Sequence, residues 1–299
     1  MHASEDSGCC GGPLSRLRMK MLLIASAMFV VTFTVGDLGR AQNGWVPVDA
    51  PPGIDAPGAL WIKVRAPDDR WLLAAVYRPA GPGPFPVLVV LDGASGIRRG
   101  ALVRAELFAN AGFLAVAACW QAGSEGVAYL DCSEAPSLDE AMSDPGLRHP
   151  RALIDASRSL PGASPDYLGL YGISHGGYVA LVTASLGAAV HAIVADSANY
   201  APRQAVPISR STVEGIQAPV LVLHGTADAT VDVQLARDYE QTARDLGKVV
   251  EAYYYEGVGH PVGSSPESAQ DVRRRSAEFF ALHLASSSAC VRAPVGRCA

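Results

Sequence analysis

The sequence lacks any long basic block, and its acidic residues outnumber the basic ones. Lys and Arg total 24 against 29 Asp and Glu, the formal net charge is −5, and basic runs are short, as at 273–275. Nucleic-acid-binding proteins normally carry a basic patch or stripe, so we expect no nucleic-acid partner. Internal repeats and heptad arrays are also missing, which argues against repeat and coiled-coil architectures. Charged residues are only 18% of the 299 residues and hydrophobic residues 49%, so the chain can bury a large core.

The apolar run near the N-terminus, residues 21–36, is shorter than the roughly 20 residues of a typical membrane span. Basic residues precede it within 16–20, and the small-x-small sequence Gly39-Arg40-Ala41 follows it. This order predicts an export signal over residues 1–41 that is removed before Gln42, leaving a secreted or periplasmic chain with no stable membrane span. Two alternatives stay open: the segment is kept as an anchor helix, or translation starts at Met19 or Met21.

Cysteines are few and lack metal-binding spacing. The chain has six, of which two lie in the predicted signal, and the other four form no C-x-x-C pair and have no histidine neighbours to complete a zinc set. We therefore expect no metal site. An even number of cysteines in an exported protein favours disulfides, and a preference for short loops pairs Cys119 with Cys132 and Cys290 with Cys298. Four buried free thiols, or another of the three connectivities, are the alternatives.

Apolar runs alternate with segments of helical spacing along most of the chain. A hairpin is expected at 60–65 and 71–77, where two apolar segments flank the turn cluster 67–70. The strands expected after it are 87–91, 113–118, 167–173, 192–195, 220–223 and 249–255. The helices expected between and after them are 101–111, 147–160, 175–186, 231–246 and a last one that begins at Ser265-Pro266. This alternation predicts an α/β fold, with a mainly parallel central sheet covered by helices on both faces.

The predicted elements leave room for one catalytic domain. We expect it to span 58–286, after the signal at 1–41 and an extended, Pro- and Gly-rich lead-in at 42–57, and before a C-terminal tail at 287–299. The longest insertions between elements are about 20 to 25 residues, within the range of ordered functional loops. The sequence therefore predicts no large lid domain.

One motif with chemical meaning is G-x-S-x-G, at Gly172-Ile173-Ser174-His175-Gly176. The pattern alone is weak in a glycine-rich chain, but here it joins a predicted buried strand to a predicted helix, as a nucleophile elbow requires. Gly172 and Gly176 permit the tight turn that exposes the Ser174 hydroxyl, and the His175 N–H at the helix start faces developing negative charge. Ser174 is thus the predicted nucleophile and His175 N–H an oxyanion donor. The structural alternative is an ordinary glycine-rich turn with a buried serine.

A serine nucleophile needs a base and a supporting acid, and candidates for both follow predicted strands. His260 lies in a Gly-rich loop, 256–261, which can carry an imidazole across the carboxyl edge of the sheet. Asp228 follows the preceding strand on the same edge. The order Ser174, Asp228, His260 is the order found in α/β hydrolases, which favours this triad. Asp196, one strand earlier, is the competing acid. The alternative for His260 and for either acid is an ordinary loop residue without a catalytic role.

Three segments together resemble the dienelactone-hydrolase and prolyl-oligopeptidase branch of the α/β hydrolases. They are 172–178, 224–228 and 255–260, and they follow one another in order along the predicted domain. The resemblance implies an α/β-hydrolase fold and cleavage of esters, lactones or peptide bonds. Dienelactone hydrolases usually carry a cysteine nucleophile where this chain has serine, and prolyl oligopeptidases carry a β-propeller, for which no repeat is present. The chain is therefore most similar to the compact, lidless, esterase-like members.

The family pattern also implies a second oxyanion donor, the N–H of Ala94, in the loop 92–96 after the strand 87–91. Relatives often have His-Gly at the start of this loop, whereas this chain has Asp92-Gly93. A carboxylate too near an oxyanion would oppose it, so this departure bears on the charge of the site.

These observations predict a serine hydrolase that cleaves carboxylic esters or related acyl bonds of small molecules through an acyl-enzyme, without a cofactor. A serine peptidase or an acyltransferase uses the same triad, and a non-catalytic binding protein on a hydrolase scaffold is the alternative from another class. Without a lid we expect an open pocket suited to short or medium acyl groups, with Trp120 on one wall and Tyr178 near the other. The alternative for both aromatic side chains is an ordinary place in the core.

Overall fold

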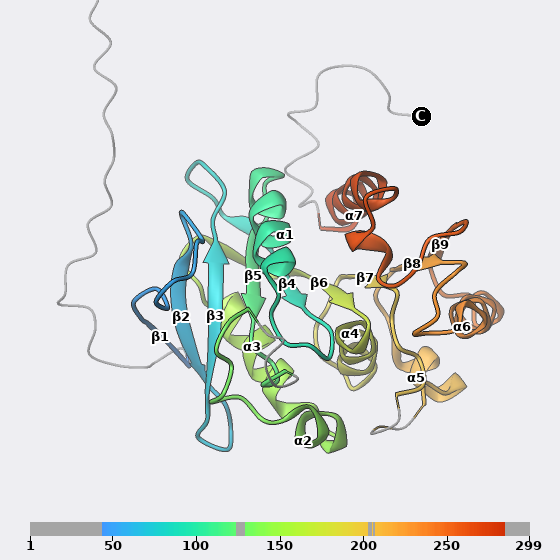
Figure 1. The fold of residues 1–299 in the computed structure, drawn as a ribbon, viewed down its shortest axis with the longest axis horizontal. Coiled ribbons are helices and arrows are strands. Elements are labelled where there is room, and N and C mark those ends of the chain that lie inside the picture. The colour runs from blue at the N-terminus through green and yellow to red at the C-terminus, as the bar shows by residue number, and fades with distance from the viewer. Residues whose placement is uncertain (1–43, 124–128, 203–204, 206, 285–299) are drawn as a thin grey trace, which may run out of the picture. The chain divides into compact units, whose positions relative to one another are not determined.

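The computed structural model describes most of the predicted domain: residues 44–123, 129–202, 205 and 207–284. The predicted signal 1–41, the tail 287–299 and the predicted pair Cys290 and Cys298 lie outside these residues. Within the described chain, nine strands form one sheet in the order β1-β2-β3-β5-β4-β6-β7-β8-β9 (Figure 1). None of the helices in this part of the chain is long and apolar enough to cross a membrane.

Antiparallel strands form one end of the sheet: β1 (Trp45–Pro47), β2 (Leu60–Arg65) and β3 (Trp71–Tyr77). β2 and β3 are the hairpin that the sequence predicts, with Asp69 in the left-handed region, at φ 68°, inside its turn. β1 is not among the predicted strands, because it lies in the Pro- and Gly-rich lead-in 42–57. It forms through backbone pairing with the open side of β2, a long-range contact that short sequence patterns do not reveal.

β3 pairs antiparallel with β5, and from β5 onward the sheet is parallel. The parallel strands are β4 (Phe85–Leu91), β5 (Leu114–Ala118), β6 (Ala163–Ile173), β7 (Ala192–Asp196), β8 (Val220–Gly225) and β9 (Val250–Tyr255). Their carboxyl ends are in step: Ile173 lies opposite Asp196, and Gly225 lies opposite Tyr255. The residues that follow these strands therefore meet at one edge, where open α/β sheets bind their ligands. The prediction of a mainly parallel sheet is confirmed.

Helices cover both faces of the sheet (Figure 1). Those on one face are α1 (Arg99–Asn110) and α7 (Ala269–His283). Those on the other face are α3 (Arg148–Arg158), α4 (His175–Ser185) and α6 (Val233–Asp245). The short ones are α2 (Leu138–Ser143), α5 (Arg210–Gly215) and the 3₁₀ turn η2 (Val262–Ser264). The helices on both faces and the mainly parallel sheet confirm the predicted α/β architecture. No separate lid domain occurs among the described residues.

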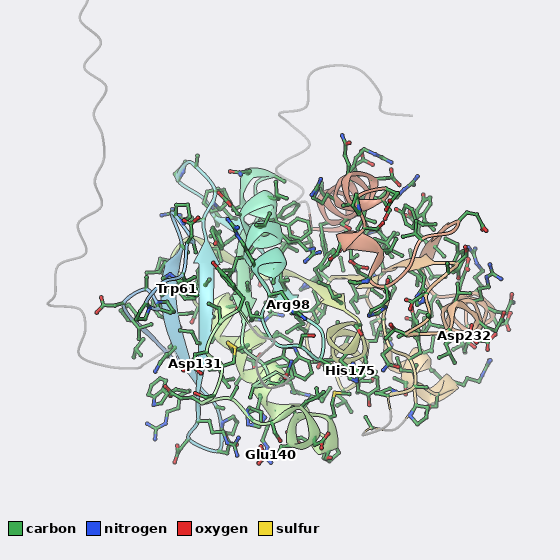
Figure 2. All side chains as sticks on the ribbon, in the orientation of Figure 1. Trp61, Arg98, Asp131, Glu140, His175 and Asp232 are labelled. Atoms are coloured by element: carbon green, nitrogen blue, oxygen red, sulfur yellow. A yellow bond between two sulfur atoms is a disulfide. The ribbon has the colours of Figure 1, made fainter. Side chains whose placement is uncertain are left out.

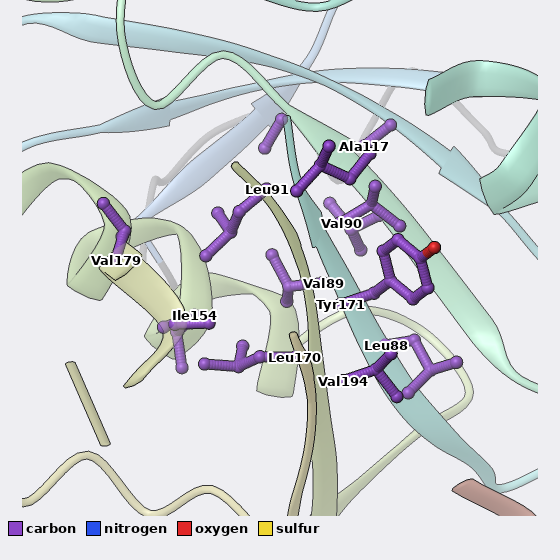
Figure 3. Packing of buried hydrophobic residues seen from close by; sticks show 14 of the residues in the cluster. Leu88, Val89, Val90, Leu91, Ala117, Ile154, Leu170, Tyr171, Val179 and Val194 are labelled. Atoms are coloured by element: carbon purple, nitrogen blue, oxygen red, sulfur yellow. The ribbon is translucent and has the colours of Figure 1, made fainter. Parts of the chain in front are cut away.

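The central strands are packed on both faces, so successive side chains of one strand point to opposite helix layers. In Figure 3, Leu170 of β6 lies on the side of Ile154 from α3 and Val179 from α4. Its neighbour Tyr171 points the other way, where its ring lies 5.5 Å from that of Phe108 in α1. This two-sided packing makes the strand ends rigid supports for the loops that follow them.

The helices differ from the prediction at α2, at α5, which the sequence pattern leaves in a loop, and at the start of α7. α2 is not among the predicted helices, although a capping box marks its start: Ser137 Oγ accepts the Glu140 N–H and the Glu140 carboxylate accepts the Ser137 N–H. α7 begins at Ala269 and not at Ser265-Pro266, because the preceding turn is held by a bond from Ser268 Oγ to the first carbonyl of η2. That turn follows the histidine loop and helps to fix it.

Candidate active site

Ser174 lies at the turn between β6 and α4, with φ 53° and ψ −117°, a conformation that is strained for any residue with a side chain. The turn closes because its glycines lie where no side chain would fit. A Cβ atom on Gly172 would lie 2.4 Å from Gly176 O, and one on Gly176 would lie 2.0 Å from Leu91 O. The close packing maintains the strain and presents Ser174 at the carboxyl edge of the sheet, as in a nucleophile elbow.

His260 and Asp228 face each other at the same edge. The loop after β9 carries His260, the turn after β8 carries Asp228, and His260 Nδ1 lies 2.7 Å from Asp228 Oδ2. A carboxylate only accepts hydrogen bonds, so this contact assigns the proton to Nδ1 and leaves Nε2 as the basic nitrogen. The structure thus brings the predicted base and acid into contact and places both on the edge that bears Ser174.

Asp228 is held by further groups besides His260. Its Oδ1 accepts the N–H groups of Thr230 and Val231, both at 2.8 Å, and His224 Nε2 lies 3.3 Å from its Oδ2. Burial by itself raises the pKa of Asp228, but the bonds from the two histidines and from Val231 N–H outweigh it and keep that pKa well below its ordinary value. The carboxylate is therefore ionised at neutral pH, as the support of an imidazolium requires. His224 begins the segment 224–228 that carries the family resemblance, but no sequence pattern marks it as a partner of Asp228.

The depressed pKa of Asp228 predicts a pH-dependent contribution to stability. Replacing Asp228 with Asn should lower the free energy of unfolding at pH 7 by about 2 kcal/mol, since charged hydrogen bonds are lost. A carboxyl group whose pKa is lower in the folded state stabilises the folded protein at pH values above its unfolded pKa of about 3.9. This stabilisation is lost as the pH falls from there through the pKa of the folded state. The difference between wild type and variant should therefore shrink below pH 4 in urea denaturation. A constant difference from pH 7 to pH 3 would contradict the assigned ionisation.

The competing acid, Asp196, contacts different groups. Its Oδ2 accepts the Tyr171 hydroxyl at 2.6 Å, and its Oδ1 accepts the Gly263 N–H at 3.2 Å. A Cβ atom on Gly263 would lie 2.2 Å from Asp196 Oδ2, so this approach requires glycine. The neighbouring Ser197 Oγ accepts the Val262 N–H at 3.0 Å. Asp196 and Ser197 therefore anchor the backbone of the histidine loop, whereas the imidazole of His260 contacts the carboxylate of Asp228, after β8.

A cavity of about 480 Å³ opens beside Ser174 and His260. Its other walls include the loop after β4, Arg98 immediately before α1, and Arg104 within α1. His175 also lines it, and Figure 2 labels His175 and Arg98. Burial, with a smaller effect from His260, lowers the pKa of His175, so its imidazole is neutral at pH 7. Among the described residues, no cluster of His, Cys, Asp or Glu could hold a metal ion.

The loop 92–96 packs directly against the nucleophile. A Cβ atom on Gly93 would lie 3.3 Å from Ser174 Cβ. Ala94, in the same loop, lines the cavity, and so does His175 in the first turn of α4. The two predicted oxyanion donors therefore belong to residues that share one cavity with Ser174.

Asp92 turns its carboxylate toward backbone donors. Its Oδ1 accepts the Gly93 N–H and its Oδ2 accepts the Arg98 N–H, both at 2.9 Å. Burial raises the pKa of Asp92, and the two backbone bonds and the nearby arginine charges offset part of that rise. Asp92, which departs from the family pattern, thus stabilises the conformation of the loop 92–96 through these two backbone bonds.

Trp120 and Tyr178 are not among the residues that line the cavity, so the expectation of two aromatic walls is corrected. Trp120 is only 1% exposed and donates from Nε1 to Asp92 O at 2.9 Å. Tyr178 is buried within α4. Both rings therefore lie in the hydrophobic core and not on a wall of the cavity. Gln121, which no sequence pattern marks, lies beside Trp120 and donates from Nε2 to Gly93 O at 2.9 Å.

Cys119 and Cys132 lie at the end of β5 and in the stretch that follows it. Their sulfur atoms are within bonding distance and their Cα atoms are 5.6 Å apart, in the usual range for a disulfide. Cys119 immediately precedes Trp120, so this link holds the chain at the point where it passes behind the loop 92–96.

Comparison with known proteins identifies related sequences and folds. The model of the dienelactone hydrolase family matches residues 72–283. A protein of Methylorubrum extorquens named "Putative carboxymethylenebutenolidase" is 26% identical over 249 residues, which are 76% of this chain and 82% of that protein.

Two solved structures share the fold. A dienelactone hydrolase-like promiscuous phosphotriesterase from metagenomic libraries has a TM-score of 0.63 at 22% identity, covering 75% of this chain and 98% of its own. Esterase 2 of Thermogutta terrifontis, phosphorylated by paraoxon, has a TM-score of 0.59 at 20% identity, covering 80% of this chain and 100% of its own.

Proposed function

This chain belongs to the dienelactone hydrolase family, and from that premise we propose that it is a serine hydrolase that cleaves carboxylic esters through an acyl-enzyme. Ser174 is the nucleophile, His260 the general base and Asp228 the supporting acid. The observation that carries the proposal is the 2.7 Å contact between His260 Nδ1 and Asp228 Oδ2 beside a serine on a strained elbow. A fold alone does not define an activity, and these three side chains are what supports the assignment.

The first half of the reaction forms the acyl-enzyme. Ser174 Oγ attacks the ester carbonyl carbon while its proton passes to His260 Nε2, and Asp228 stabilises the resulting imidazolium. The negative charge on the carbonyl oxygen is stabilised by the N–H groups of His175 and Ala94. The C–O bond to the alcohol then breaks, and the alcohol leaves with the proton from His260.

The second half returns the enzyme to its starting state. A water molecule gives a proton to His260 Nε2 and attacks the acyl carbon, which forms the same oxyanion at the same donors. Collapse of this intermediate breaks the bond to Ser174 Oγ, which recovers its proton from His260, and releases the carboxylic acid. These steps need neither a cofactor nor a metal ion.

The reactivity of one protein with the same fold fits this proposal. The Thermogutta esterase is described as phosphorylated by paraoxon. We extend that reactivity to Ser174 as an expectation for this chain. Export as a secreted or periplasmic protein, with or without a retained N-terminal anchor, is part of the proposal, and a link between Cys119 and Cys132 suits an oxidising compartment.

The substrate class is tested with a series of p-nitrophenyl esters of increasing acyl length. A cavity of about 480 Å³ without a lid domain accommodates a compact ester, so we expect kcat/KM to be highest for short or medium acyl chains. Neighbouring chain lengths should differ by roughly 10- to 200-fold at most, because one methylene in an apolar pocket is worth roughly 1 to 3 kcal/mol. Trp120→Phe should leave the length profile unchanged, since Trp120 lies outside the cavity lining. Highest kcat/KM on long-chain lipid esters, with interfacial activation, would contradict the open pocket.

The same assays separate the alternatives. A serine peptidase would cleave peptide anilides faster than the matched esters, and an acyltransferase would transfer the acyl group to an added alcohol in preference to water. A non-catalytic scaffold would hydrolyse none of the esters and would not react with a fluorophosphonate. The esterase proposal expects ester hydrolysis and covalent labelling together.

A further inference from the structure

The chain that leaves β5 supports the oxyanion loop, 92–96, from its far side. Trp120 Nε1 donates to Asp92 O and Gln121 Nε2 donates to Gly93 O, each at 2.9 Å. Both side chains are 1% exposed. Neither lines the cavity, whereas the loop residues that they bind do. Two side-chain donors therefore hold successive carbonyl groups of the loop from the side opposite to the substrate.

The amide of Gln121 can face the loop in only one sense. Its Oε1 accepts the Gly123 N–H, which places Nε2 opposite Gly93 O. Reversing the amide would put two acceptors together on one side and two donors on the other. The segment also packs closely, because a Cβ atom on Gly123 would lie 2.7 Å from Ser95 O. Gln121 is thus a fixed donor to the Gly93 carbonyl.

Peptide geometry links this bond to the reaction. The Gly93–Ala94 peptide is not among the cis bonds of the described chain. The C=O and N–H groups of a trans peptide point in opposite directions. Gly93 O also accepts the Gly96 N–H at 3.1 Å, so Gln121 and the turn 93–96 hold this carbonyl together. Holding Gly93 O on that side turns the Ala94 N–H toward the other side of the loop, where the cavity and Ser174 lie.

We propose that Gln121 is a positioning residue for ester hydrolysis. By holding Gly93 O, it helps to direct the Ala94 N–H, which is one of the two donors of the oxyanion hole. The inference depends on the proposed function, because it assigns a supporting role within that site. Gln121 does not touch the substrate; it acts through the backbone. Its contribution appears only where negative charge develops on the carbonyl oxygen, and therefore in the transition state and not in substrate binding.

The test compares Gln121→Met with Gln217→Met. Methionine keeps an unbranched side chain and removes the donor. Gln217 is a matched control because its Nε2 also donates to backbone carbonyls, those of Glu214 and Gly215, and none of these residues lines the cavity. We expect Gln121→Met to lower kcat by about 10- to 100-fold with KM within about twofold, less than the loss of a whole oxyanion donor. Affinity for a trifluoromethyl ketone, which forms a tetrahedral adduct with an oxyanion, should fall by the same factor. Affinity for the product carboxylate should stay unchanged, and Gln217→Met should match wild type in all three.

Two more variants make the result decisive. Gln121→Asn keeps an amide that is one methylene too short to reach Gly93 O, so it should reproduce the loss if the methionine variant does not fold. Trp120→Phe removes the bond to Asp92 O and part of a buried ring but keeps the Gln121 bond to Gly93 O, and it should have a smaller effect on kcat. A folded Gln121 variant that binds the trifluoromethyl ketone as wild type does would overturn the inference. Wild-type protein that takes up no fluorophosphonate at Ser174 would instead overturn the proposed function, and the inference with it.

Discussion

Ser174→Ala is expected to reduce ester hydrolysis to the background rate, a loss of about a millionfold in kcat if the triad acts as a unit. Alanine has no nucleophilic oxygen, so no acyl-enzyme forms, although the cavity, the histidine loop and the oxyanion donors stay in place. Because both serine and alanine carry a Cβ atom in the strained conformation at φ 53°, the melting temperature should stay close to that of wild type. The measurement is steady-state turnover of a short p-nitrophenyl ester, with circular dichroism as the check on folding.

Ser185→Ala is the matched control for this variant. Ser185 ends the same helix, α4, and its Oγ donates to the Val182 carbonyl, away from the cavity lining. Its removal should leave kcat within about twofold of wild type. Appreciable turnover by Ser174→Ala, in a preparation free of host esterases, would mean that another residue is the nucleophile.

Substitutions in the base and the acid are expected to have graded effects. His260→Ala should lose about as much activity as Ser174→Ala, because no other group removes the proton from the hydroxyl. Asp228→Asn should lower kcat by about three to four powers of ten. The amide N–H of asparagine can donate to His260 Nδ1, which leaves the imidazole proton on Nε2, the nitrogen that must accept the serine proton. His191→Ala serves as the control, because His191 accepts the Leu168 N–H at a distance from the cavity lining.

The comparison with Asp196 decides which carboxylate is the acid. Asp196→Asn should reduce kcat less than Asp228→Asn, because Asp196 bonds the loop backbone and the Tyr171 hydroxyl, whereas Asp228 bonds the imidazole. Full activity in Asp228→Asn together with a large loss in Asp196→Asn would reverse the assignment.

The fold and the triad candidates could be predicted because each leaves a local signal. Apolar runs bounded by glycine mark the buried strands, and a parallel sheet brings the ends of these strands to one edge whatever the details of packing. Ser174 combines a strand, a tight glycine turn and a helix in five residues. Asp228 and His260 each follow a strand on that edge, and the structure places them in contact.

Other parts of the site depend on contacts between residues far apart in the sequence. Trp120 and Gln121 act on carbonyl groups 28 residues earlier in the chain, and such bonds leave no periodic pattern. The expectation that Trp120 lines the pocket assumed that a large aromatic at the carboxyl edge faces the ligand; its indole N–H instead turns it beneath the loop. The contact between His224 and Asp228 leaves no periodic pattern either, because it depends on the fold of the turn that carries Asp228.

The central claim is that Ser174 is a nucleophile activated by its surroundings, and covalent labelling tests it most directly. The full-length protein is incubated with a fluorophosphonate at neutral pH, digested, and mapped by tandem mass spectrometry. We predict one stoichiometric adduct, on Ser174 in the peptide that contains Gly172-Ile173-Ser174-His175-Gly176, with none in Ser174→Ala and much slower labelling in His260→Ala. An adduct on another serine, or no adduct on a folded wild-type protein, would contradict the account.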